Sequence, residues 1–225
     1  MVLGIYLINK PVGITSHDVI YKLRKITGEK TIGHAGTLDP MASGLLIVAI
    51  GRKFTKQIDQ FKNLDKTYEA IVILGASSTT DDSEGDKTEV SKKEPELSEV
   101  LSALEKIKDW DEQLPPKFSA KKIKGQTAYN LARKGKKVDL KSVPVKIYDI
   151  ENIIYNYPSV SFVCAVSSGT YIRSIARDLG EVLGVGGYLS SLVRGRIGEY
   201  RLDDAGDLGA IITTKDLERY KIDYE

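Results

Sequence analysis

Residues 33–46 read GHAGTLDPMASGLL and place one acidic side chain, Asp39, in a loop built mostly of small residues. Pro40 biases Asp39 away from helical geometry, and the glycines allow tight turns or a close approach to another molecule. The apolar run 45–50 follows at once and predicts a buried strand. A strand that holds a loop with one carboxylate and one histidine, His34, is typical of an active site.

An isolated Asp-Pro pair more often forms a simple turn in which the aspartate accepts a backbone hydrogen bond. Three further segments stand out besides this loop. They are Lys10-Pro11-x-Gly13 near the N-terminus, Lys66-x-Tyr68, and SGTYIR at 168–173. Together with the Asp39 loop, and in this order, these segments resemble the motifs of the TruB-type tRNA pseudouridine synthases over nearly the whole chain.

The resemblance implies an α+β pseudouridine synthase fold: a central mixed, mostly antiparallel sheet with flanking helices, an active-site cleft and a basic insertion that grips RNA. It also implies the reaction, which converts uridine 55 in the T-loop of tRNA to pseudouridine after the base has flipped out of the RNA stack. In that family the loop aspartate, here Asp39, is the nucleophile. Attack on the uracil ring and attack on the ribose anomeric carbon both remain open, and no metal or other cofactor is required.

Arg173 and Tyr68 complete the catalytic group that the resemblance implies. If a helix begins near Thr170, Arg173 lies in its first turn, where the helix dipole disfavours a cation. Such a locally unfavourable position indicates a functional role, here to keep Asp39 ionised. The alternative for Arg173 is a solvated residue or a surface ion pair. In the family the tyrosine stacks on the extruded base and helps remove the carbon 5 proton, whereas the alternative for Tyr68 is ordinary core packing.

Five further residues are candidates for binding the substrate. His34 is implied to position the flipped nucleotide, and Tyr171 and Leu192 match positions that line the uracil pocket, with core packing as their alternative. Lys10 is expected to support the Asp39 loop or to contact RNA. Lys66 is expected to support Tyr68 or to touch a phosphate.

Positive charge is concentrated between residues 117 and 146, where ten Lys/Arg and one acid give a net charge of +9. A charge excess of this kind attracts a phosphate backbone. The resemblance assigns this segment to the insertion that grips the tRNA T-arm, with contacts to phosphates rather than bases. The predicted backbone contacts are Lys124, Arg133, Lys134, Lys136 and Lys137.

The 225 residues are predicted to form a single catalytic domain, with the insertion at about 115–146 and a short C-terminal stub at about 200–225 in place of a separate PUA-type domain. Two histidines and one cysteine, Cys164, do not make a usual zinc cluster. The absence of an 18-residue apolar stretch argues against a membrane partner. A single cysteine cannot form an internal disulfide, which favours a cytoplasmic location. We further expect a monomer without an obligate protein partner.

Local patterns also predict the main secondary structure. The expected helices and strands are a strand at 3–9, a helix capped by Ser16 and closed by Gly28, a short helix near 53–61, a strand at 66–74, helices at 97–108, near 126–134 and from Thr170 to about Leu183, and strands at 145–156 and 159–167. Residues 76–95 are expected to be a long loop. Three alternatives to the proposed function remain open: a catalytically inert tRNA-binding or tRNA-folding module, a glycoside or nucleoside hydrolase, and the same reaction on another RNA.

Overall fold

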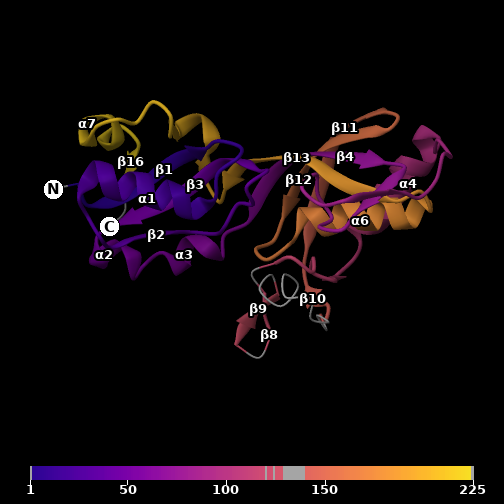
Figure 1. Cartoon of the computed structure of the whole chain (residues 1–225), viewed down its shortest axis with the longest axis horizontal. Helices are drawn as coiled ribbons and strands as arrows, with labels where there is room; N and C mark the ends of the chain where they lie inside the picture. Colours follow the sequence, from indigo (N-terminus) through magenta and orange to yellow (C-terminus); the bar gives the residue numbers. More distant parts are fainter. Residues whose placement is uncertain (1, 120, 124, 129–139, 224–225) are drawn as a thin grey trace. The chain divides into compact units, whose positions relative to one another are not determined.

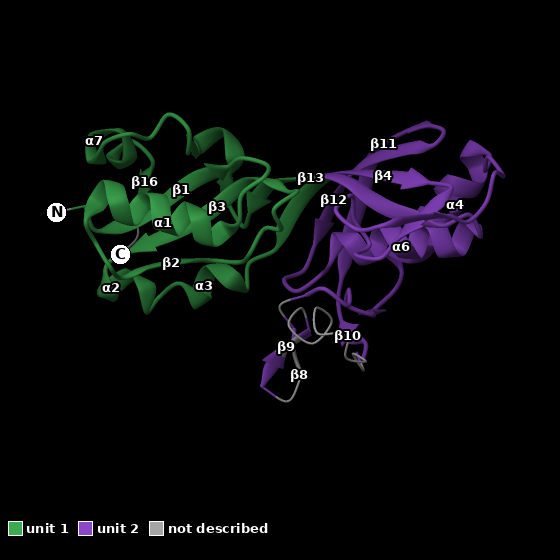
Figure 2. Cartoon of the chain, in the orientation of Figure 1, with its two compact units in different colours: residues 1–69, 192–225 green, residues 70–191 purple. Residues whose placement is uncertain are grey.

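The structure, a computed structural model, describes residues 2–119, 121–123, 125–128 and 140–223 (Figure 1). The five predicted phosphate contacts lie outside the residues whose side chains are described. Of the helix expected near 126–134, residues 129–134 lie outside the described residues, and its expected start at 126–127 is wrong because Gln126–Thr127 form a strand. The chain divides into two compact units (Figure 2). Residues 1–69 with 192–225 form unit 1, and residues 70–191 form unit 2. A single catalytic domain that includes both units stays a prediction.

Strand β3 (Ser43–Ile50) is the centre of unit 1. It is antiparallel to β1 (Gly4–Lys10) along its length and to β2 (Ile32–His34) near its C-terminal end. At its N-terminal end it runs parallel to β13 (Gly187–Ile197), with Arg194 opposite Gly44. All residues of β3 after Ser43 are buried, which explains why its sequence is continuously apolar rather than alternating.

Two apolar cores cover the two faces of this sheet. On one face, helix α1 (Ser16–Thr27) buries Ile20 and Leu23 against side chains of β1 and β3. On the other face, Phe61 of the short helix α3 (Asp59–Lys62) packs in a second cluster. Helix α2 (Arg52–Thr55) precedes α3, so the single helix expected near 53–61 is two short ones. Each such fully buried side chain contributes on the order of 1.5–3 kcal/mol relative to exposure.

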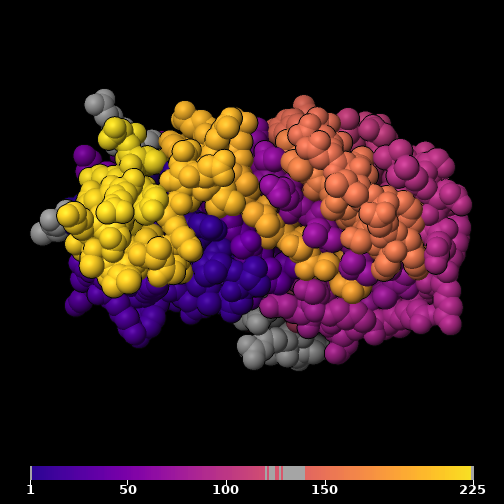
Figure 3. Space-filling view, turned by 90° about the horizontal axis from the view of Figure 1, so that it is seen from above, coloured from indigo at the N-terminus to yellow at the C-terminus, as the bar shows by residue number. Residues whose placement is uncertain are grey.

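Residues 200–223 complete unit 1. The elements of this segment are β14 (Tyr200–Arg201), the 3-10 helix η1 (Leu202–Asp204), β15 (Gly206–Asp207), α7 (Thr214–Glu218) and β16 (Lys221–Ile222). Both β15 and β16 pair with β1, and Leu208, Ile211 and Leu217 belong to the core under α1. The C-terminal residues accordingly lie against N-terminal ones in Figure 3. The segment expected to be a short C-terminal stub is therefore an integral part of unit 1.

Unit 2 is built on antiparallel strands with helices packed against them. Strand β12 (Ser159–Val166) lies between β11 (Ile147–Asn156) and β4 (Lys66–Leu74), which begins in unit 1. Helix α4 (Leu97–Lys108) packs against α6 (Ile172–Leu183) and β11. The smaller strands form three two-stranded pairs: β5 (Ala76–Ser78) with β6 (Lys87–Glu89), β7 (Glu112–Gln113) with β10 (Val143–Pro144), and β8 (Lys122–Ile123) with β9 (Gln126–Thr127).

The predicted elements are largely confirmed, with further differences besides the divided helix near 53–61. The expected loop at 76–95 contains the hairpin β5–β6, and β13 was not predicted at all. Both predicted helix caps are displaced by one residue: Thr15 rather than Ser16 caps α1, and Tyr171 rather than Thr170 precedes α6. No helix of the part that the structure describes is long and apolar enough to cross a membrane.

Candidate active site

The backbone on both sides of Asp39 is held by the segment that precedes α1. The Ser16 hydroxyl accepts a hydrogen bond from the Leu38 amide at 2.9 Å and donates to the Leu38 carbonyl at 3.2 Å. The Gly13 amide donates to the Pro40 carbonyl at 2.8 Å. The half-buried Asp39 is thus fixed through its two neighbours, which is how a reacting group is preorganised.

Lys10 supports the segment that holds the Asp39 loop. Its side chain is fully buried, and Nζ donates to the carbonyls of Pro11 at 2.9 Å and Ile14 at 2.6 Å. These residues flank Gly13, whose amide holds the loop. The structural alternative predicted for Lys10 is therefore the one observed. The other expectation for Lys10, a contact with RNA, stays a prediction.

Arg194 of β13 is a second buried cation, and the sequence reasoning missed it. Its Nε donates to the Leu45 carbonyl at 2.8 Å and its Nη2 to the Gly36 carbonyl at 3.2 Å. These carbonyls lie on either side of Asp39 in the chain. A signal was present in the sequence: Arg194 stands two residues after Leu192, so both share one face if this segment is a strand.

His34 and Lys66 also belong to unit 1, and both have altered pKa values. Burial, followed by the positive charge of Arg194, lowers the pKa of the half-buried His34. The same two causes, in the same order, lower the pKa of the buried Lys66 to about 8. The Lys66 ammonium donates to the carbonyls of Lys62 and Leu64. In this structure its hydrogen-bond partners are backbone carbonyls, and the expected phosphate contact by Lys66 stays a prediction.

Tyr68 and Leu192 lie on buried faces of their strands. Tyr68 alternates with Lys66 and Ala70 on the buried side of β4, as the sequence predicts. Leu192 is buried in β13, on the same face as Arg194. Both positions are compatible with a lining role and with core packing, so their contact with a uracil base stays a prediction.

Arg173 is the second residue of α6, and its side chain is only 6% exposed. Its Nη1 lies 3.5 Å from an oxygen of Asp82, and its guanidinium donates to the carbonyls of Thr80 and Phe118. The alternative of a solvated surface residue is therefore wrong. Because Arg173 belongs to unit 2 and Asp39 to unit 1, their pairing stays a prediction.

Asp82 is a candidate site residue that lay within the segment expected to be a loop. Its side chain is 4% exposed. One of its oxygens accepts from the Thr80 hydroxyl and from the Glu84 amide, while the other faces Arg173. A buried carboxylate of this kind fixes the direction of a guanidinium group. The turn that carries Asp82 thus orients Arg173.

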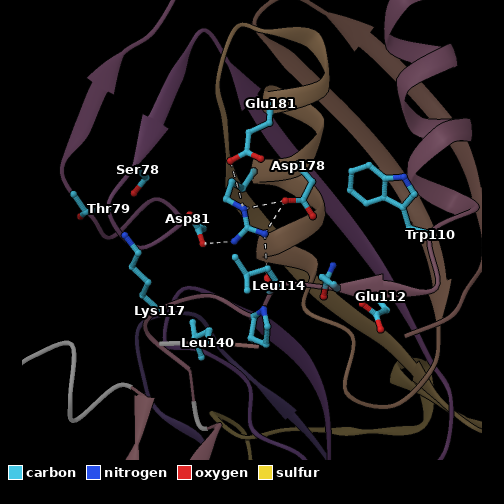
Figure 4. A pocket seen from close by; sticks show the side chains of 13 residues that line it. Ser78, Thr79, Asp81, Trp110, Glu112, Leu114, Lys117, Leu140, Asp178 and Glu181 are labelled. Atoms are coloured by element: carbon cyan, nitrogen blue, oxygen red, sulfur yellow. Dashed lines mark hydrogen bonds and ion pairs between the residues drawn. The ribbon is translucent and has the colours of Figure 1, made fainter. Parts of the chain in front are cut away.

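One helical turn further along α6, Arg177 repeats the pattern at a cavity of about 550 Å³ (Figure 4). Its guanidinium contacts Asp178 at 2.7 Å and Asp81 at 3.2 Å. Burial raises the pKa of both carboxyl groups. Trp110 and Lys117 also line the cavity. The charged groups around Arg177 satisfy one another and tie the turn after β5 to α6.

The segment that leads into the basic insertion is bound to the same helix. The Tyr171 amide, at the start of α6, donates to the Gln113 side chain, and the hydroxyl of Ser174 donates to the Leu114 carbonyl, both at 2.8 Å. The Arg173 bond to Phe118 extends this series. Tyr171 is half-buried, and its predicted place in the uracil pocket is not tested. The residues at the start of the insertion, Gln113 to Phe118, are thus hydrogen-bonded to the N-terminal part of α6, the helix that carries Arg173.

Comparisons with known proteins identify the family of this chain. The model of the TruB family pseudouridylate synthases (N-terminal domain) matches residues 24–172. The tRNA pseudouridine synthase B of Chlamydia pneumoniae is 47% identical over 204 residues, which cover 91% of this chain and 86% of that protein. That of Protochlamydia amoebophila is 44% identical over 216 residues, covering 96% of this chain and 82% of that protein.

Solved structures give the same fold. A chain of a crystal structure of a Cbf5–Nop10–Gar1 complex has a TM-score of 0.71 and 28% identity over 92% of this chain. A chain of an H/ACA RNP bound to a substrate RNA containing 2'-deoxyuridine has a TM-score of 0.65 and 27% identity over 92% of this chain. This chain spans about half the length of each, 53% and 52%. The predicted fold class is confirmed, and the chain belongs to the TruB family of pseudouridylate synthases.

Proposed function

We propose that the chain converts uridine 55 in the T-loop of tRNA to pseudouridine, with Asp39 as the nucleophile. Membership of the TruB family supports the reaction class, and relatives named tRNA pseudouridine synthase B support tRNA as the substrate. The observation that carries the proposal is the fixed backbone at Asp39, held through Leu38 by Ser16 and through Pro40 by Gly13. A simple surface turn does not need anchors on both sides.

The chemistry sets the order of events. The target base first leaves the RNA stack, because its reactive atoms are hidden there. The Asp39 carboxylate then forms a covalent bond with the uracil ring or with the ribose anomeric carbon. The bond between the base nitrogen and the ribose breaks, the uracil rotates, and its carbon 5 joins the anomeric carbon. Loss of the carbon 5 proton and release of Asp39 give the product.

The remaining site residues have supporting roles in this proposal. Arg173 stabilises the ionised carboxylate, and Tyr68 stacks on the extruded base and assists loss of the carbon 5 proton. His34, Tyr171 and Leu192 surround the nucleotide. The basic insertion binds phosphates of the T-arm, and we propose that a monomer suffices, in the cytoplasm and without a protein partner.

Tritium release tests the reaction. An unmodified tRNA transcript labelled at carbon 5 of uridine is expected to release one tritium per tRNA, because only one site is modified. A matched transcript with cytidine at position 55 is expected to release none. Free uracil in the reaction would indicate a hydrolase. Tight tRNA binding without tritium release would indicate an inert binding module. Full tritium release from the cytidine transcript would indicate that another uridine is the target.

A further inference from the structure

Arg194 is the largest fully buried side chain among the residues that the structure describes, with 1% of its surface exposed. A guanidinium group is rarely placed so deep, because burial of a charge is costly unless other groups compensate it. Its hydrogen-bond partners are the carbonyls of Gly36 and Leu45. The compensation therefore comes from the backbone of the Asp39 loop.

The two hydrogen bonds join the ends of that loop. Gly36 precedes Asp39 by three residues, and Leu45 follows it by six. The packing is close as well as specific: a Cβ atom added at Gly44, which has φ +108°, would lie 2.5 Å from the Arg194 carbonyl oxygen. One residue of β13 thus sets both the width of the loop and its distance from the neighbouring strand.

The positive charge of Arg194 has no carboxylate partner within 4.0 Å among residues 2–119, 121–123, 125–128 and 140–223. Asp39 is the one acid in the loop that Arg194 holds. A half-buried carboxyl group stays ionised more easily beside such a cation. The basic groups around this loop are Lys10, His34 and Lys66, with Lys62 and His17 close enough to act on His34. Arg194 lowers the pKa of both His34 and Lys66, and Asp65 is the acid that acts on Lys66 in the opposite direction.

We propose that Arg194 is a positioning residue for the reaction, which holds the two ends of the Asp39 loop and keeps the loop carboxylate ionised. The inference rests on the proposed function, in which Asp39 is the nucleophile. It adds a cation of unit 1 to Arg173 of unit 2. Arg173 is expected to contact the carboxylate directly, whereas Arg194 acts through the backbone and through its electrostatic potential.

The experiment compares Arg194→Met, which removes the positive charge, with Arg194→Lys, which keeps the charge but lacks the planar guanidinium group. Arg196→Met is the matched control, because Arg196 is exposed on the same strand and lies two residues away. Single-turnover tritium release from tRNA is measured from pH 4.5 to 8.5, together with tRNA affinity. Arg194→Met is expected to shift the acid limb of the rate profile upward by roughly one pH unit, with affinity within threefold.

Arg194→Lys is expected to leave the acid limb in place while the plateau rate falls at least tenfold. An unshifted limb in folded Arg194→Met, or an unchanged plateau in Arg194→Lys, would overturn the inference. If Arg194→Met does not fold, the lysine variant alone decides between these results. If wild type releases no tritium, the proposed function fails, and a carbon-13 NMR titration of the Asp39 carboxyl group still tests Arg194: its midpoint must move to higher pH in a neutral variant.

Discussion

Replacing Ser16 with alanine removes the hydroxyl that holds Leu38, the residue before Asp39. Both residues are buried, with 2% and 3% of their surface exposed, so water does not readily replace the lost bonds. Two hydrogen bonds disappear, and the Leu38 amide and carbonyl lose a buried partner. At about 1–2 kcal/mol for each backbone group, the variant is expected to lose about 2–4 kcal/mol of unfolding free energy.

Part of that loss should appear in the reaction rate. If the loop leaves its productive geometry at a cost of about 1.4 kcal/mol or more, the single-turnover rate falls at least tenfold. The affinity for tRNA should change little, because Ser16 does not lie on the exposed surface. Tritium release and filter binding on the same tRNA transcript measure the two quantities separately.

Thr15→Ala is the matched control. Thr15 caps α1 by accepting a hydrogen bond from the Asp18 amide, so its loss is expected to cost about 1 kcal/mol of stability. Thr15 makes no hydrogen bond to Leu38 in the described structure, and its rate should remain close to wild type. Equal rates for Ser16→Ala and Thr15→Ala would refute the reasoning that the Ser16 bond positions Asp39.

Three further changes have defined outcomes. Asp82→Asn retains the shape of the turn but removes the negative charge beside Arg173. The single-turnover rate should therefore fall at least tenfold, while tRNA affinity is maintained. A wild-type rate would contradict the role of Asp82 in orienting Arg173. Lys66 has a lowered pKa in the folded protein, so the unfolded chain binds more protons than the folded one between pH 8 and 10.5. The unfolding free energy of wild type relative to Lys66→Met, measured with urea, should therefore rise by about 1–2 kcal/mol from pH 8 to 9.5. A constant difference over this range would contradict the lowered pKa. Gly44→Ala is expected to destabilise the protein by about 3 kcal/mol or more in thermal or urea unfolding. Gly33→Ala should be tolerated, because Gly33 has no positive φ and the nearest atom to an added Cβ lies 3.7 Å away. Similar losses of stability in both variants would contradict the close-packing argument.

Elements with a clear local period could be predicted from the sequence. The alternation in 66–74 gives β4 with its observed bounds, and the apolar spacing in 97–108 gives α4. The Asp39 loop stands out because small residues, a proline and an apolar run are adjacent, whereas its catalytic role came from the resemblance to the TruB-type synthases. These signals depend on neighbouring residues only, so no knowledge of tertiary contacts is needed.

The contacts that hold the site could not be predicted in the same way. Arg194 and Leu45 are 149 positions apart, and Asp82 and Arg173 are 91 positions apart. Ser16 has a good local signal for a helix cap, but a partner 22 residues away, Leu38, occupies its hydroxyl and leaves the cap to Thr15. Tertiary contacts of this kind override local preference.

The role of Asp39 is tested most directly by Asp39→Asn. Asparagine has nearly the same shape but no anionic oxygen, so it is expected to bind tRNA within about threefold of wild type and to release no tritium above background. Turnover retained by this variant, on a transcript labelled only at uridine, would contradict the account.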